Sequence, residues 1–134
     1  MMACMRARTL SVSILRDPKS VYAFVSNLEN LPQWATTFCR SATRSNDGWT
    51  IDTPQGPMTM RVTGNNDLGI VDHAVIPADG AAVFVPMRIV PNGPGSEVLF
   101  TLFQRPGMSD DQYAQDMRLV EQDLTSLKRV METV

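Results

Sequence analysis

The sequence contains few of the residues from which disulfide frameworks and metal sites are built. Its 134 residues include two cysteines, Cys4 and Cys39, and one histidine, His73. Two cysteines do not make a disulfide framework in a chain of this length. Two reduced thiols are the simpler interpretation, and they favour a cytoplasmic location. No cluster of His, Cys and carboxylate residues has the spacing of metal ligands, so we expect no metal site.

Long apolar runs and an excess of positive charge are also missing. No stretch approaches the roughly 20 consecutive apolar residues of a transmembrane helix. No apolar segment follows the arginines of residues 1–8, as it would in a signal peptide. The net charge is −2, whereas nucleic-acid-binding domains usually carry a basic stripe. We expect neither membrane insertion nor binding to nucleic acid.

Sequence motifs of common enzyme classes do not occur either. The run Gly93-Pro94-Gly95 contains a proline and leads into a predicted strand, whereas a phosphate-binding loop precedes a helix. There is no Gly-x-Ser-x-Gly nucleophile elbow. These absences argue against kinase, dehydrogenase and hydrolase chemistry, and we expect no cofactor.

Hydrophobic residues are abundant enough for a proper core. They make up 43% of the chain, and the length suits one domain rather than two. We expect residues 1–8 to form a frayed N-terminus and residues 9–134 to form a single domain.

The N-terminal part predicts a strand followed by two short helices. Residues 10–14 alternate between apolar side chains and serine, which is typical of a half-buried strand. Asp17-Pro18 predicts the start of a helix over residues 18–26, because Asp caps helices and Pro suits the first helical position. We expect Asn27 to end this helix in left-handed geometry and Asn30 to cap a second short helix.

Residues 38–104 carry only strand and turn signals. Short runs of alternating apolar and polar residues are separated by turns such as Asn46-Asp47-Gly48 and Pro54-Gln55-Gly56-Pro57. One strand is expected over residues 69–76, and Pro77 should end it. Consecutive strands with short loops predict an antiparallel meander.

A long amphipathic helix is predicted at the C-terminus. Ser109 and Gln112 have the spacing of a capping box. From Tyr113 to Val134 apolar residues recur every three or four positions over about six turns. Charged residues, Asp116 and Asp123 among them, are expected on the other faces. A coiled-coil seam would give the same pattern, but the preceding strands need a cover, which favours packing on the sheet.

The order of these elements resembles the SRPBCC superfamily, which includes START lipid-transfer domains, the birch-pollen allergen family and polyketide cyclase/dehydrase-like proteins. The most specific piece lies within residues 17–34, where Asn27, Glu29, Pro32 and Trp34 follow an apolar helix. In length the chain is most similar to the small bacterial cyclase/dehydrase-like members. The resemblance implies an α+β helix-grip fold. In that fold a curved antiparallel sheet of about six or seven strands, two short helices and a long C-terminal helix enclose a cavity.

Strand alternation indicates which side chains point into such a cavity. Charged or hydroxyl residues such as Asp52, Arg61 and Arg88 mark the outer face, and the opposite parity points inward. Methionine adapts to irregular volumes, so an inner face rich in it would suit an apolar ligand. The alternative is that these side chains simply fill the interior. The candidate ligand-binding residues are Trp34, Met58, Met60, His73, Val85, Met87, Phe100, Tyr113, Met117 and Val120. Leu127 and Met131 are expected in the core.

His73 is the candidate catalytic residue. It faces the cavity if Val71 and Val75 share its face, which we favour because Asp72 prefers water. A histidine can act as an acid or a base near neutral pH. A lone inward histidine is nevertheless more often a satisfied core residue, and no second catalytic partner is indicated.

Three functions remain open at this point. The leading hypothesis is non-enzymatic binding of a small hydrophobic or amphipathic molecule, lipid- or polyketide-like, in the internal pocket. The second is an enzyme of the polyketide cyclase/aromatase type that uses the same pocket and His73. The third is an interaction module that forms a homodimer.

Overall fold

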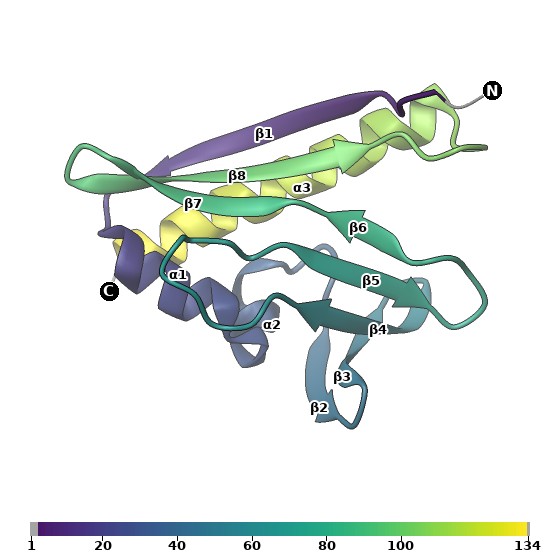
Figure 1. The fold of residues 1–134 in the computed structure, drawn as a ribbon, viewed down its shortest axis with the longest axis horizontal. Helices are drawn as coiled ribbons and strands as arrows, with labels where there is room; N and C mark the ends of the chain where they lie inside the picture. Colours follow the sequence, from purple (N-terminus) through teal and green to yellow (C-terminus); the bar gives the residue numbers. More distant parts are fainter. Residues whose placement is uncertain (1–2, 134) are drawn as a thin grey trace.

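The computed structural model describes residues 3–133 of the chain. They form two antiparallel sheets, two short α-helices, one 3₁₀-helix and one long α-helix (Figure 1). The elements are β1 (Ala7–Ile14), α1 (Pro18–Ser26), the 3₁₀-helix η1 (Leu28–Asn30), α2 (Leu31–Trp34), β2 (Ser41–Ser45), β3 (Gly48–Thr53), β4 (Gly56–Val62), β5 (His73–Pro77), β6 (Val83–Val85), β7 (Met87–Asn92), β8 (Gly95–Phe103) and α3 (Asp110–Glu132). Met1, Met2 and Val134, which belong to the predicted N-terminus and the end of the predicted helical stripe, lie outside the described residues.

The two sheets are joined by one bent segment. Their strand orders are β1-β8-β7 and β2-β3-β4-β5-β6. β6 pairs with β5, whereas β7 pairs with β8, and only Pro86 separates β6 from β7. Proline has no N–H to donate, and its carbonyl accepts from the Thr101 N–H at 3.0 Å. The break at Pro86 contributes to a total of eight strands, where six or seven were expected.

The predicted strand over residues 69–76 is divided in a similar way. β5 begins at His73, and the residues before it pair with β7. The Val71 N–H donates to the Met87 carbonyl, and the Ile89 N–H donates to the Gly69 carbonyl, both at 2.9 Å. Gly69 has a φ of +73°, and a Cβ there would lie 2.1 Å from the Ile89 carbonyl oxygen. Only glycine allows this close approach between the two segments.

The first helices begin where the sequence predicts, but Asn27 acts differently. The Asp17 carboxylate accepts from the Ser20 N–H and caps α1. Asn27 has φ −92° and ψ 105°, so the expected left-handed geometry is wrong. Its side chain instead accepts from the Glu29 N–H and caps η1. Asn30 precedes α2 as expected, but its side chain makes no cap hydrogen bond and donates to the Phe24 carbonyl. The two asparagines therefore hold the bend between the helices.

The long helix begins at its predicted cap. The Ser109 hydroxyl accepts from the Gln112 N–H at 3.1 Å. Gln112 does not complete the capping box, because its side chain donates to Asp116. The helix lies along β1, and the two residues expected in the core, Leu127 and Met131, are buried there.

Candidate functional site

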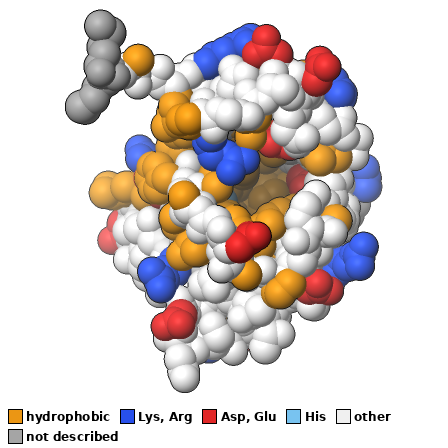
Figure 2. All heavy atoms as spheres, turned by 90° about the vertical axis from the view of Figure 1, so that its right-hand side faces the viewer, with side chains coloured by type: hydrophobic (Ala, Val, Ile, Leu, Met, Phe, Trp, Pro, Cys, Tyr) orange, Lys and Arg blue, Asp and Glu red, His pale blue; other side chains and the backbone are white. Residues whose placement is uncertain are grey.

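A cavity of about 530 Å³ lies between the curved sheet and the first half of α3. It opens to solvent at the end where α3 begins and β5 ends, and Figure 2 shows the hollow from that side with hydrophobic side chains inside. Ligand pockets usually measure roughly 300–1,000 Å³. The interior is therefore not filled by side chains, which was the alternative left open by the sequence.

Most of the predicted lining residues do face this cavity. Those that line it are Trp34, Met58, Met60, His73, Val85, Met87, Phe100 and Val120. They come from α2, five strands and α3, together with further apolar side chains such as Leu28 and Phe38. The sheet contributes them with period two, because alternate side chains of a strand share one face.

Tyr113 and Met117 were expected at the cavity and lie elsewhere. Tyr113 is 1% exposed, and its hydroxyl donates to the Leu102 carbonyl at 2.8 Å. Met117 packs against the core. The α3 side chains that line the cavity belong to Gln112, Asp116, Leu119, Val120 and Asp123. This face borders the apolar stripe rather than coinciding with it.

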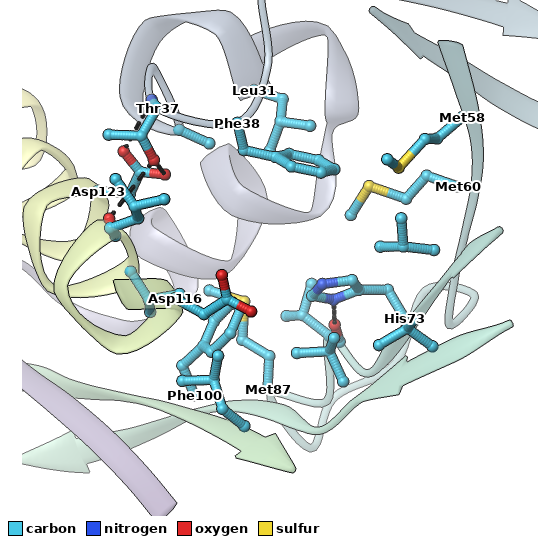
Figure 3. Close-up of a pocket in the computed structure, with 18 of the residues that line it drawn as sticks. Leu31, Thr37, Phe38, Met58, Met60, His73, Met87, Phe100, Asp116 and Asp123 are labelled. Atoms are coloured by element: carbon cyan, nitrogen blue, oxygen red, sulfur yellow. Dashed lines mark hydrogen bonds between the residues drawn. The ribbon is translucent and has the colours of Figure 1, made fainter. Parts of the chain in front are cut away.

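The helix wall of the cavity therefore carries two carboxylates that the sequence placed on the outer faces. Asp123 is 6% exposed. Its oxygens accept from the Thr37 backbone N–H at 3.1 Å and from the Thr37 hydroxyl at 2.6 Å. Burial raises the pKa of Asp123, although the two Thr37 hydrogen bonds oppose the shift. Asp116 points into the cavity from the same helix (Figure 3). Asp116 and Asp123 are seven residues apart in the sequence, and this spacing places both on one face of a helix.

His73 projects into the cavity from the opposite wall (Figure 3). Its Nδ1 lies 3.0 Å from the Val71 carbonyl oxygen. A carbonyl oxygen can only accept, so Nδ1 carries the proton, and Nε2 of the neutral ring presents a lone pair. Burial lowers the pKa of His73, and this outweighs the Val71 hydrogen bond and nearby Asp72, which act to raise it. The ring of Phe100 meets the imidazole edge-on at 5.9 Å between centroids.

The predicted orientation of His73 is thus confirmed, and Asp72 lies on the other face of the sheet. The Asp72 carboxylate pairs with the Arg88 guanidinium at 2.8 Å and also accepts from the Met87 N–H. The Arg88 hydrogen bond holds the pKa of Asp72 below its usual value. A charged pair outside therefore fixes the strand segment that presents His73 inside.

His73 lies at the inner end of the cavity. Its neighbours there, Met60, Val71 and Met87, are all buried. β5 then runs toward the mouth, where its last residue, Pro77, pairs with half-buried Met58. The side chains at the rim that are exposed and polar are Gln55, Arg105 and Gln112.

Within residues 3–133, no three His, Cys, Asp or Glu side chains are grouped so that they could hold a metal ion. No helix in that range is long and apolar enough to cross a membrane.

Comparisons with known proteins give matches in structure only. No protein-family model matches the sequence, and no curated protein matches it. A START superfamily protein from Mycobacterium smegmatis is 17% identical with a TM-score of 0.70, over 95% of this chain and 97% of that one. Ara h 8.0201 is 9% identical with a TM-score of 0.69, over 97% and 99% of the two chains. DynU16, a protein of the dynemicin biosynthetic locus, is 15% identical with a TM-score of 0.74, over 95% of this chain and 47% of that one.

These likenesses establish the architecture. They span nearly the whole chain at identities below 20%, which is a range in which a fold persists without a shared function. The chain has the α+β helix-grip fold of the SRPBCC superfamily, as the sequence resemblance implied.

Proposed function

We propose that this helix-grip protein binds a small hydrophobic or amphipathic molecule, lipid- or polyketide-like, in the cavity beneath α3. The observation that carries the proposal is the cavity itself, about 530 Å³ of space walled mainly by apolar side chains and open at one end. Protein interiors are normally packed as densely as organic crystals. A space of this size in so short a chain is therefore a feature that function explains better than stability does.

The apolar lining supplies the binding energy in this proposal. Removing apolar surface from water contributes about 25 cal/mol per Å². The inner lining residues Met60, Val71 and Met87 come from three different segments of the sheet region. A ligand that reaches them is surrounded on most sides, as ligands in functional pockets usually are. The likeness to a START superfamily protein and to a protein of the dynemicin locus supports a small-molecule role.

A cavity-filling variant tests the proposal. Isothermal titration calorimetry with 1-methoxynaphthalene, a neutral apolar probe, should show one site per chain. Leu119 lines the cavity, so Leu119→Trp should weaken binding by about tenfold or more, which corresponds to about 1.4 kcal/mol. Leu68 is 74% exposed, so Leu68→Trp is the matched control and should bind as the wild type does.

Two results would overturn the proposal. One is the absence of probe binding to the folded wild-type protein. The other is an equal affinity of Leu119→Trp and Leu68→Trp, which would place the probe outside the cavity. Native mass spectrometry of freshly purified protein then looks for a co-purified molecule and gives its mass.

The second candidate function, a cyclase/aromatase-type enzyme, is favoured by one observation. The unprotonated Nε2 of His73 faces the cavity, and burial keeps the imidazole neutral by lowering its pKa. Such an enzyme mainly holds and orients a reactive chain, so one proton-transfer group is sufficient. Incubation with a poly-β-keto thioester should yield a cyclised product faster with wild type than with His73→Met. Equal rates would exclude His73 as the proton-transfer group. The homodimer hypothesis stays a prediction, which light scattering tests.

A further inference from the structure

The polar side-chain atoms that face the inner cavity are hydrogen-bond acceptors. They are the Nε2 lone pair of His73 on the sheet wall and the carboxylates of Asp116 and Asp123 on the helix wall. Figure 3 shows Asp116 and His73 directed toward each other across the space. Among the described residues, no protein group makes a hydrogen bond to His73 Nε2.

The donors among the lining residues are engaged, covered or confined to the rim. The Thr37 hydroxyl donates to Asp123 at 2.6 Å. The indole Nε1 of Trp34 is fully enclosed by protein atoms, although no partner accepts its proton. Gln55, Arg105 and Gln112 carry their N–H groups on exposed side chains at the mouth, and the Gln112 amide donates to Asp116 there at 2.8 Å.

The protonation state of His73 follows from its backbone partner. Val71 O holds the ring proton on Nδ1 at 3.0 Å, so Nε2 becomes a donor only if the whole ring gains a positive charge. The ring meets Phe100 edge-on and shares the cavity wall with Met60 and Met87, and transfer of a charge into such apolar surroundings is unfavourable. The inner wall therefore keeps its acceptor character at neutral pH.

We propose that the ligand is an apolar molecule that carries a hydroxyl or amine hydrogen and no carboxylate, and that His73 Nε2 accepts this hydrogen at the inner end of the cavity. This inference rests on the proposed binding function and adds the chemical class of the ligand. A buried acceptor left without a donor loses the hydrogen bond that it makes to water. A ligand carboxylate at the same place would find no donor, and it would be repelled by Asp116 and Asp123. A free fatty acid bound head-first is thereby excluded as the ligand.

Three probes of one size and shape test this selectivity by calorimetry at pH 7.5. They are 1-naphthol, 1-methoxynaphthalene and 1-naphthoate, which present a donor, an acceptor and an anion. We expect the naphthol to bind roughly tenfold more tightly than the ether, the gain of one net hydrogen bond, and the naphthoate to bind most weakly. Equal affinities, or tightest binding of the naphthoate, would overturn the inference. If the ether does not bind at all, the proposed binding function fails instead.

A variant pair assigns the preference to His73. His73→Met keeps the approximate volume of the side chain but removes the imidazole acceptor. The ratio of the affinities for 1-naphthol and 1-methoxynaphthalene should therefore fall roughly tenfold. Met60→Leu, a volume-conserving change in the same wall, is the control and should keep the ratio. A ratio unchanged by His73→Met would contradict the assignment.

A spectroscopic readout covers the case in which His73→Met does not fold. His73 is the only histidine of the chain, so ¹⁵N-histidine labelling of the wild type gives one unambiguous pair of ring signals. The signal of the unprotonated Nε2 should move toward that of a hydrogen-bonded nitrogen on addition of 1-naphthol and stay in place with the ether. An unaffected Nε2 signal at saturating naphthol would overturn the inference.

Discussion

The two halves of α3 carry the same amphipathic pattern but have different surroundings. In the C-terminal half, Leu124, Leu127 and Met131 are at most 3% exposed and pack against the core. In the N-terminal half, Leu119 and Val120 face the cavity and are only half-buried. An apolar stripe thus tells which face of a helix turns inward. It does not tell whether the space opposite that face is filled.

The two halves of α3 differ in burial because different elements lie opposite them. The C-terminal half approaches β1, and its end is held by the Lys128 ammonium, which donates to the Ser13 carbonyl at 2.8 Å. The N-terminal half faces the second sheet, whose last strand, β6, ends just before the chain changes sheets at Pro86. Figure 1 shows this second sheet curving away from the helix. One half of α3 therefore stabilises the fold, and the other half forms a wall of the site.

Removing packed side chains from the two halves of α3 should change stability by very different amounts. Leu127 is completely buried, so Leu127→Ala should lower the free energy of unfolding by about 2–5 kcal/mol. Leu119 borders an existing space, so Leu119→Ala should cost less than about 1 kcal/mol because it creates little new cavity. Guanidinium denaturation of both variants measures the difference. Similar losses would mean that the N-terminal half is as tightly packed as the C-terminal half.

The next effect concerns the polar anchor of the cavity half. Asp123→Ala leaves the Thr37 N–H and hydroxyl without their acceptor, and we expect a loss of about 1–3 kcal/mol in the free energy of unfolding. Asp116→Ala, on the same helix face, should stay within about 0.5 kcal/mol of the wild type. A double-mutant cycle with Thr37→Val isolates the contact. Additive losses in the cycle would show that the contact does not stabilise the fold.

A smaller effect is expected where the cavity half begins. The Ser109 hydroxyl caps α3 by accepting from the Gln112 N–H, and Ser109→Ala should cost about 1 kcal/mol. Thermal unfolding followed by circular dichroism measures this cost, and Ser109→Asp, which can still cap, should restore stability. An unstable Ser109→Asp variant would argue that the hydroxyl acts in another way.

His73 should make the stability of the protein depend on pH, but only in acid. The pKa of His73 is lowered in the folded protein below its ordinary value of 6.5. Above pH 6.5 the ring is neutral in both states, whereas below it the unfolded chain takes up a proton that the folded chain resists. Stability should therefore fall as the pH drops from 6.5 toward the folded-state pKa. His73→Met should lack this slope between pH 5 and 6.5 in denaturation measurements, and an identical slope in both proteins would contradict it.

The carboxylate on the helix wall should show the opposite dependence. Burial raises the folded-state pKa of Asp123 above its ordinary value of 3.8. The stability that comes from this shift is fully present below pH 3.8 and is lost as the pH rises through the folded-state pKa. The two dependences belong to opposite walls of one cavity. Asp123→Asn separates them, since it removes the second and leaves the first.

The sequence predicted local structure well because the signals are local. Asp17-Pro18 and Ser109 mark the helix starts that the structure shows. The strand parity correctly turned Met60 and Met87 inward, and it did so because one face of each strand carries charge. The geometry of Asn27 was predicted incorrectly, since the 3₁₀-helix that follows competes for its side chain.

The site was harder to predict because its outline depends on distant segments. Which face of α3 lines the cavity depends on how the helix packs against β1 and α2 and on the bond from the Tyr113 hydroxyl to the Leu102 carbonyl, and not on the helix alone. The Asp123–Thr37 contact joins residues 86 positions apart. A carboxylate at the border of an apolar stripe has no local feature that distinguishes a cavity wall from a solvated face.

One half of α3 encloses an accessible cavity and the other half does not, and methionine methyl groups report on both. Met58, Met60 and Met87 line the cavity, whereas Met131 is buried in the packed core. Methyl NMR of ¹³C-methionine-labelled protein, titrated with 1-methoxynaphthalene, should shift the three cavity signals and leave that of Met131 in place. Cavity signals that stay unchanged while the signal of exposed Met5 shifts would mean that the probe does not enter the cavity.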